Sequence, residues 1–143
     1  MLEEIKDQGQ VLAIIVRAGY SASGIRFFTP GQFSQQLAYM QHPAGKQIDA
    51  HCHVPQPRSV EVTQEVLIIR RGKLRVDFYR DDRAYLESRV LGAGDVILLA
   101  HGGHGFEVLE EIEMIEVKQG PYAGEGEKTR FAAVSPNRVN IIP

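Results

Sequence analysis

Apolar and polar residues alternate along much of the chain, in short stretches that predict β-strands rather than helices. Residues 11–16 and 25–29 are rich in β-branched or aromatic side chains, and a run of small residues separates them. Residues 46–54 alternate more regularly, because apolar side chains at every second position leave His51 and His53 on the opposite face of the predicted strand.

The second half of the chain continues in the same way. Residues 65–69 are apolar on both faces after the first position, and we expect Arg70 to Lys73 to turn the chain back. Residues 33–40 are ambiguous, since their apolar spacing also fits a helix; we favour a strand. The remaining predicted strands are 74–79, 85–91, 96–100, 106–109, 112–117 and a last one at 131–134.

Short strands about ten residues apart, with turn residues between them, are typical of an antiparallel sandwich or barrel. The chain has 143 residues, 14 glycines, seven prolines, 43% hydrophobic and 24% charged residues, which is ordinary for one globular domain. We therefore predict a single all-β domain over residues 1–143.

Charge and apolar content exclude two classes of partner. The net charge is −2, and no block of basic residues forms a footprint for nucleic acid. The longest aliphatic runs, at 11–16 and 96–100, are far shorter than a membrane span of about 20 residues. The acidic start does not resemble a secretory signal, and a single cysteine, Cys52, cannot form an internal disulfide. We expect a cytoplasmic protein.

Histidines supply the candidate chemistry, because four of the five lie in two compact clusters. On one strand, the imidazoles of His51 and His53 point the same way from Cα atoms about 7 Å apart, so both can reach one ion. Glu65 and His104 begin or precede other predicted strands and would add ligands if they face the same interior. Three imidazoles and one carboxylate suit iron, manganese, nickel, cobalt or zinc, with positions left open for a substrate.

The first motif of the cupins resembles this arrangement. That motif is glycine, five residues, His-x-His, three or four residues, glutamate, six residues and glycine; here Gly45 precedes His51 and His53 by the same spacing, and Glu65 precedes Gly72 by six residues. Eleven residues rather than three or four separate His53 from Glu65, which implies an inserted loop. Counting from His53 would favour Glu61 as the ligand, whereas the spacing to the second glycine favours Glu65.

The second cupin motif is matched less fully, by Gly94 and the residues from Ala100 to His104, with alanine in place of proline and one residue fewer before the histidine. The choice between His104 and His101 stays open, with His104 in the better position. The resemblance covers about residues 35–120 and implies a cupin-type double-stranded β-helix, or jelly-roll barrel, with extra N-terminal strands. His51, His53, Glu65 and His104 are then the implied metal ligands.

Other polar residues have simpler explanations. Cys52 lies on the face away from the two histidines and is expected to be a packed thiol. His101 is expected at the rim of the pocket, and His42 at the surface. Lys118, Tyr122, Lys128 and Arg130 are candidates for a rim that contacts anions, although surface charge is the simpler explanation.

Cupins include enzymes and binding proteins, so the resemblance defines a site better than a reaction. We expect a metal-dependent enzyme that acts on a sugar or small organic acid, of the isomerase, epimerase or dioxygenase type, in which the ion is a Lewis acid or binds dioxygen. The alternative is a module that binds or senses a small ligand without catalysis. A homodimer is expected, because the strand-rich N-terminal stretch can extend the sheet of a neighbour.

Overall fold

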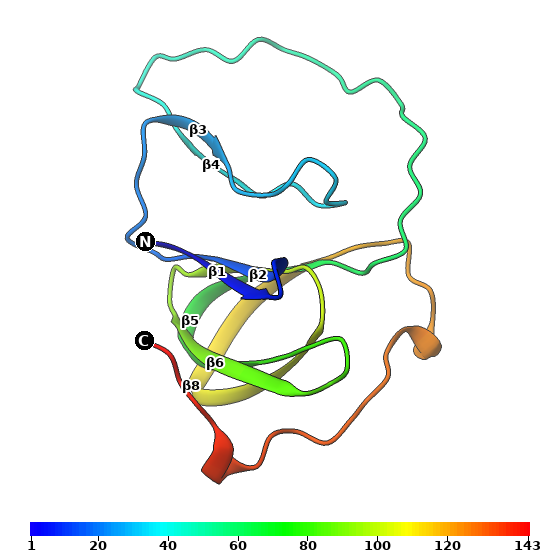
Figure 1. Cartoon of the computed structure of the whole chain (residues 1–143). Coiled ribbons are helices and arrows are strands. Elements are labelled where there is room, and N and C mark those ends of the chain that lie inside the picture. The colour runs from blue at the N-terminus through cyan, green and yellow to red at the C-terminus, as the bar shows by residue number, and fades with distance from the viewer.

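The computed structural model describes all 143 residues, and its regular secondary structure is almost entirely β-strand (Figure 1). The chain has no α-helix, only two short 3-10 turns, and none of its helical segments is long and apolar enough to cross a membrane. The prediction of an all-β chain is confirmed. The strands are β1 (Leu2–Asp7), β2 (Gln10–Val16), β3 (Gly24–Phe27), β4 (Ala38–Gln41), β5 (Glu65–Tyr79), β6 (Tyr85–Gly92), β7 (Val96–Leu99) and β8 (Gly103–Lys118).

Six of the strands form one antiparallel sheet that curls into a half-barrel (Figure 1). Its order is β1-β2-β7-β5-β6, and β8 pairs with the other edge of β5. One side of β5 pairs with β7 over residues 65–68 and with β6 over residues 73–79, while β8 follows the opposite side along its whole length. The strand β5 is therefore the centre of the fold.

The predicted turn at Arg70 to Lys73 is wrong, because β5 continues through it as one strand. The ladder with β8 shifts register between Ile69 and Leu74, and Gly72 lies there with a positive φ of 86°. Such bulges bend a strand and increase its twist without ending it. A side chain at Gly72 would also meet the backbone oxygen of Glu111 at 2.0 Å.

Two other strand predictions near the C-terminal half differ from the structure. The predicted strands 106–109 and 112–117 are parts of the single strand β8. Glu110 and Glu111, which separate the two predicted strands, lie at the bulge in the ladder with β5. The predicted strand 131–134 does not form. Those residues instead pack beside Tyr79. The hydroxyl of Tyr79 accepts a hydrogen bond from the N–H of Val134, which a neighbouring strand would otherwise pair.

Residues 42–63 form an extended loop, here called the arm, in which every residue is exposed. The strand predicted at 46–54 is therefore wrong for this conformation, since a strand needs a neighbour to pair with and the arm has none. The strands β3 and β4 form a separate hairpin just before it. In Figure 1 the arm arches over this hairpin, on the side away from the curled sheet.

The hydrophobic core fills the concave side of the half-barrel, where alternate residues of the strands point inward. Because β2, β5 and β7 are paired in register, their inward side chains pack in layers. The core cluster consists of Ile5, Leu12, Ala13, Ile15, Leu67, Ile69, Leu74, Val76, Phe78, Leu91, Ile97 and Leu99.

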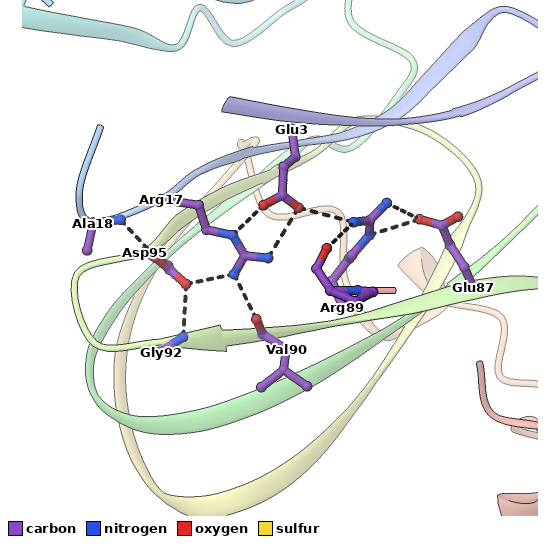
Figure 2. A network of polar contacts seen from close by, with 9 residues as sticks. Glu3, Arg17, Ala18, Glu87, Arg89, Val90, Gly92 and Asp95 are labelled. Atoms are coloured by element: carbon purple, nitrogen blue, oxygen red, sulfur yellow. Dashed lines mark hydrogen bonds and ion pairs between the residues drawn. The ribbon is translucent and has the colours of Figure 1, made fainter. Parts of the chain in front are cut away.

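A network of ion pairs closes one end of this core (Figure 2). Arg17 lies between two carboxylates, with Nε donating to Glu3 Oε1 at 2.6 Å and Nη1 donating to Asp95 Oδ2 at 2.9 Å. Asp95 is only 7% exposed and also accepts hydrogen bonds from the backbone N–H groups of Ala18 and Gly92. The network ties β1 and the end of β2 to the turn between β6 and β7, and leaves the opposite end of the half-barrel free for a site.

Candidate functional site

A cavity of about 550 Å³ lies at the end of the half-barrel where β5 begins and β8 begins. Fifteen residues line it, of which only four are hydrophobic. Its walls come from the first and last residues of β5, the start of β8, and the C-terminal segment 127–133. Its volume suits a small molecule, and the charged side chains among its lining residues indicate a ligand that carries polar or charged groups.

The central feature of the cavity is a contact between Glu65 and His104. His104 Nε2 lies 3.3 Å from Glu65 Oε2, and the side chain of Glu65 is 9% exposed while that of His104 is 30% exposed. The hydrogen bond from His104 lowers the pKa of Glu65, against the opposing effect of burial, and the charges of Lys128 and Lys118 lower it further. Glu65 is therefore held as a carboxylate beside an imidazole that solvent can reach.

Curling of the long β5–β8 ribbon produces this contact. In the ladder Glu65 pairs with Lys118, whereas His104 pairs with Phe78 near the other end of β5. A straight strand from Glu65 to Phe78 would be roughly 40 Å long. Because the bulge around Gly72 bends the ribbon, its two ends come back together at the cavity.

Tyr79, at the end of β5, forms part of the cavity wall and is only 3% exposed. Its hydroxyl accepts a hydrogen bond from the N–H of Val134 at 2.9 Å, and its ring packs edge-on against Phe131 at a centroid distance of 5.0 Å. Tyr79 thus fastens the C-terminal segment to the sheet. Sequence reasoning missed its role, since Tyr79 was only the last residue of the predicted strand 74–79.

Three cationic side chains line the cavity with Glu65 and His104. Lys118 is paired with Glu127, at 3.4 Å between Nζ and Oε2, and this contact raises the pKa of Lys118. Lys128 and Arg130 form no ion pair and no side-chain hydrogen bond within the chain. Their charges are available to an anionic ligand.

The other residues predicted for the site lie elsewhere. His51 and His53 are near each other, with ring centroids 5.5 Å apart, but both are in the exposed arm. The ring of His101 packs against Phe33 at 5.6 Å and does not line the cavity, and neither does Tyr122, which stacks beneath Lys118. The rival ligand Glu61, with His42 and Cys52, is also exposed in the arm.

The metal site expected from the sequence is therefore only half assembled in this conformation. No group of three or more His, Cys, Asp or Glu side chains is arranged to hold an ion. Structural and catalytic sites for divalent transition metals usually have more protein ligands than one carboxylate and one imidazole. The residues that the structure brings together at the cavity therefore do not fit such an ion.

Comparison of the chain with protein-family models, with curated proteins and with solved structures gives no match in any of the three. A function for this protein therefore has to be inferred from the geometry and charge of the cavity.

Proposed function

We propose that the protein is an enzyme that binds a small organic acid in this cavity and moves a proton on it, as an isomerase or epimerase does. The observation that carries the proposal is the contact of His104 with Glu65 at 3.3 Å inside a cavity that charged side chains line. An imidazole oriented by a carboxylate is a common device for general acid–base catalysis.

Each residue of the pair has a distinct part in this proposal. Glu65 stays ionised because the hydrogen bond to His104 lowers its pKa, so it can orient the ring and stabilise the imidazolium. His104 is the more exposed of the two. Its Nδ1, the ring nitrogen that does not contact Glu65, takes a proton from the carbon next to the acid group and delivers it to a different position of the same substrate, or to the opposite face of the same carbon. The proton is removed and restored, so the reaction needs no further reactant.

An organic acid is favoured over a neutral sugar because Lys128 and Arg130 line the same cavity without an ion-pair partner. A carboxylate can accept two parallel hydrogen bonds from a guanidinium, and a lysine adds a second charge. These two residues would hold the acid group of the substrate while its neighbouring carbon faces His104.

We also propose that the fold is related to the cupin double-stranded β-helix. The curled antiparallel sheet supports this relationship, as does the convergence of Glu65 and His104, which the motif spacing implied as two of four ligands. The one segment expected to carry the remaining two ligands, residues 46–54, forms no strand in this structure.

The proposed reaction is tested by incubating the protein in deuterium oxide with a panel of small organic acids and sugars. An acid that raises the thermal midpoint should also incorporate deuterium at the carbon next to its carboxylate, as seen by proton NMR. The variant His104→Gln should lower the exchange rate by at least about 100-fold while the thermal shift remains. Binding without exchange in the wild type would instead identify a binding or sensing module.

The ligand class is tested separately with the variants Lys128→Ala and Arg130→Ala. Each should weaken binding of the acid by about 10-fold, because each removes a charged hydrogen-bond donor. Arg138→Ala is the matched control, since Arg138 is exposed and does not line the cavity. Equal binding by all three variants would contradict the assignment of an acid-binding end to this cavity.

A further inference from the structure

Glu127 places a carboxylate of the chain itself at the cavity. Its side chain lines the cavity, is only 12% exposed, and contacts Lys118 with 3.4 Å between Oε2 and Nζ. Glu127 ends the 3-10 turn Glu125–Glu127, in which its N–H donates to the oxygen of Gly124 at 3.3 Å. This turn follows β8, so the chain folds back and pairs an acidic side chain with the last residue of that strand.

The sheet places Lys118 beside Glu65 and His104, the proposed acid–base pair. Lys118 is the ladder partner of Glu65, and paired residues of antiparallel strands share a face, with Cβ atoms about 5 Å apart. The carboxylate of Glu65 contacts His104. The ammonium of Lys118 instead has Glu127 as its only ion-pair partner. Glu127 therefore neutralises a cation that would otherwise be free to bind an anion next to the acid–base pair.

The charges that line the cavity balance one negative charge of a ligand and no more. Three basic and two acidic side chains line it, so the lining carries one positive charge while the imidazole is neutral. These side chains are Lys118, Lys128, Arg130, Glu65 and Glu127. A second carboxylate on the ligand would leave an excess negative charge in a partly enclosed site, where repulsion is screened less than in water.

We propose that Glu127 restricts the cavity to acids with a single carboxylate, because it holds Lys118 in an ion pair at the place where a second acid group would bind. The inference rests on the proposed function, which assigns the one carboxylate to Lys128 and Arg130. In that assignment the reacting carbon faces His104, so the atoms beyond it come to the Lys118–Glu127 pair.

The same ion pair favours hydroxyl groups on that part of the ligand. A hydroxyl both donates and accepts a hydrogen bond, and the pair offers an ammonium donor and a carboxylate acceptor side by side. Both side chains are partly exposed, Lys118 at 24% and Glu127 at 12%, so a ligand in the cavity can reach them. The ligand class is therefore a hydroxy acid with one carboxylate.

A purely structural role for the Lys118–Glu127 contact predicts a different result. If the contact only holds the C-terminal segment against β8, its loss should weaken every ligand of the cavity to the same extent. If Glu127 sets specificity, its loss should change the ratio of the affinities for acids with one and with two carboxylates. The ratio is therefore the quantity to measure.

Two matched pairs of acids test the proposal: L-threonate with L-tartrate, and D-gluconate with D-glucarate. The acids of each pair differ only at the terminal carbon, which is a hydroxymethyl group in the first and a carboxylate in the second. Isothermal titration at neutral pH and constant ionic strength measures the Kd values. The wild type should bind the monocarboxylate of at least one pair at least about 10-fold more tightly than its dicarboxylate, as expected for one charged contact.

The variant Glu127→Gln frees Lys118 and should reduce this preference by about 10-fold or reverse it. The double variant Glu127→Gln/Lys118→Gln restores the charge of the lining, so its preference should return to that of the wild type. Glu125→Gln is the matched control: it makes the same change of charge in the same turn, but Glu125 is exposed and does not line the cavity. It should leave the preference unchanged.

Several results would overturn the inference without touching the proposed acid site. These are equal binding of both acids of a pair by the wild type, a preference unchanged or all binding lost in Glu127→Gln, and an equal change in Glu125→Gln. A wild type that binds none of the four acids rejects the hydroxy-acid class. The proposed function itself fails on separate evidence, namely no deuterium exchange with any acid of the larger panel, or unchanged acid binding in the Lys128 and Arg130 variants.

Discussion

Glu65 and His104 lie at opposite ends of the β5–β8 ladder and yet approach to 3.3 Å, because the ribbon curls back on itself. The same curvature places Glu65 and Tyr79, the first and last residues of β5, in one cavity wall. Bending of a single long strand thus builds the candidate site, and the stability of that bend should be measurable.

The contact makes the stability of the protein depend on pH in a defined direction. Since the pKa of Glu65 is lowered from 4.5 on folding, mainly by the hydrogen bond from His104, the folded state binds fewer protons than the unfolded state in this range. The stabilisation is complete above that pH and is lost as the pH falls through the lowered pKa.

We therefore expect Glu65→Gln to reduce the free energy of unfolding by about 1–2 kcal/mol near neutral pH. The difference from the wild type should shrink as the pH falls below 4.5. Urea unfolding in metal-free buffer at a series of pH values measures it. A difference that stays constant down to the acid limit would show that the ionised carboxylate contributes nothing.

Gly72 is predicted to be essential to the bend in β5. An alanine there would need a positive φ and would place its Cβ 2.0 Å from the backbone oxygen of Glu111. Gly72→Ala should destabilise the protein by at least about 2 kcal/mol, from backbone strain and displacement of β8. Chemical denaturation measures the loss, and Gly126→Ala is the control, because Gly126 has open space around it. Equal stability of the two variants would contradict the role given to the bulge.

Asp95 should contribute most of the stability of the network in Figure 2. Its removal leaves Arg17 partly buried with one carboxylate fewer, and it deprives the N–H groups of Ala18 and Gly92 of their acceptor. Asp95→Ala should therefore reduce the free energy of unfolding by about 3 kcal/mol. Glu4→Ala, which breaks only the exposed pair with Lys6, should cost less than about 1 kcal/mol. Thermal and urea unfolding measure the stability of both variants. Similar losses of stability in Asp95→Ala and Glu4→Ala would contradict the larger contribution given to Asp95.

Tyr79→Phe tests whether the cavity binds its ligand only when the C-terminal segment is held to the sheet. The variant loses only the hydroxyl that accepts from Val134, so a loss of about 1 kcal/mol in stability is expected, together with weaker binding of the acid ligand. Tyr122→Phe is the matched control, because Tyr122 is 70% exposed and outside the cavity. If the two variants bind the ligand equally well, the segment does not depend on this contact.

Local patterns predicted most strands correctly, because a two-residue period reports which face of a segment is buried. These patterns failed where pairing with a neighbouring strand decides whether a segment forms a strand. Gly72 and Glu110 resemble turn residues, but a bulge lets the paired strands continue past them. The segment around His51 has the pattern of a strand, yet no neighbouring strand pairs with it in one copy.

For the site, the sequence singled out Glu65 and His104 by motif spacing, and the structure brings these two together. The contribution of Tyr79 was beyond sequence reasoning, since it depends on a segment more than 50 residues away that folds back onto the ring. Asp95 lies in the turn between β6 and β7, where an aspartate is an ordinary turn residue. Its burial results from contacts with distant strands and not from any local signal.

A crystal structure of the protein with an organic acid that raises its thermal midpoint tests the central claim most directly. The account predicts the acid in the cavity, with its carboxylate between Lys128 and Arg130 and its neighbouring carbon within reach of His104 Nδ1, the ring nitrogen that does not contact Glu65. An acid bound elsewhere on the protein, or bound with its carboxylate turned away from both cations, would contradict it.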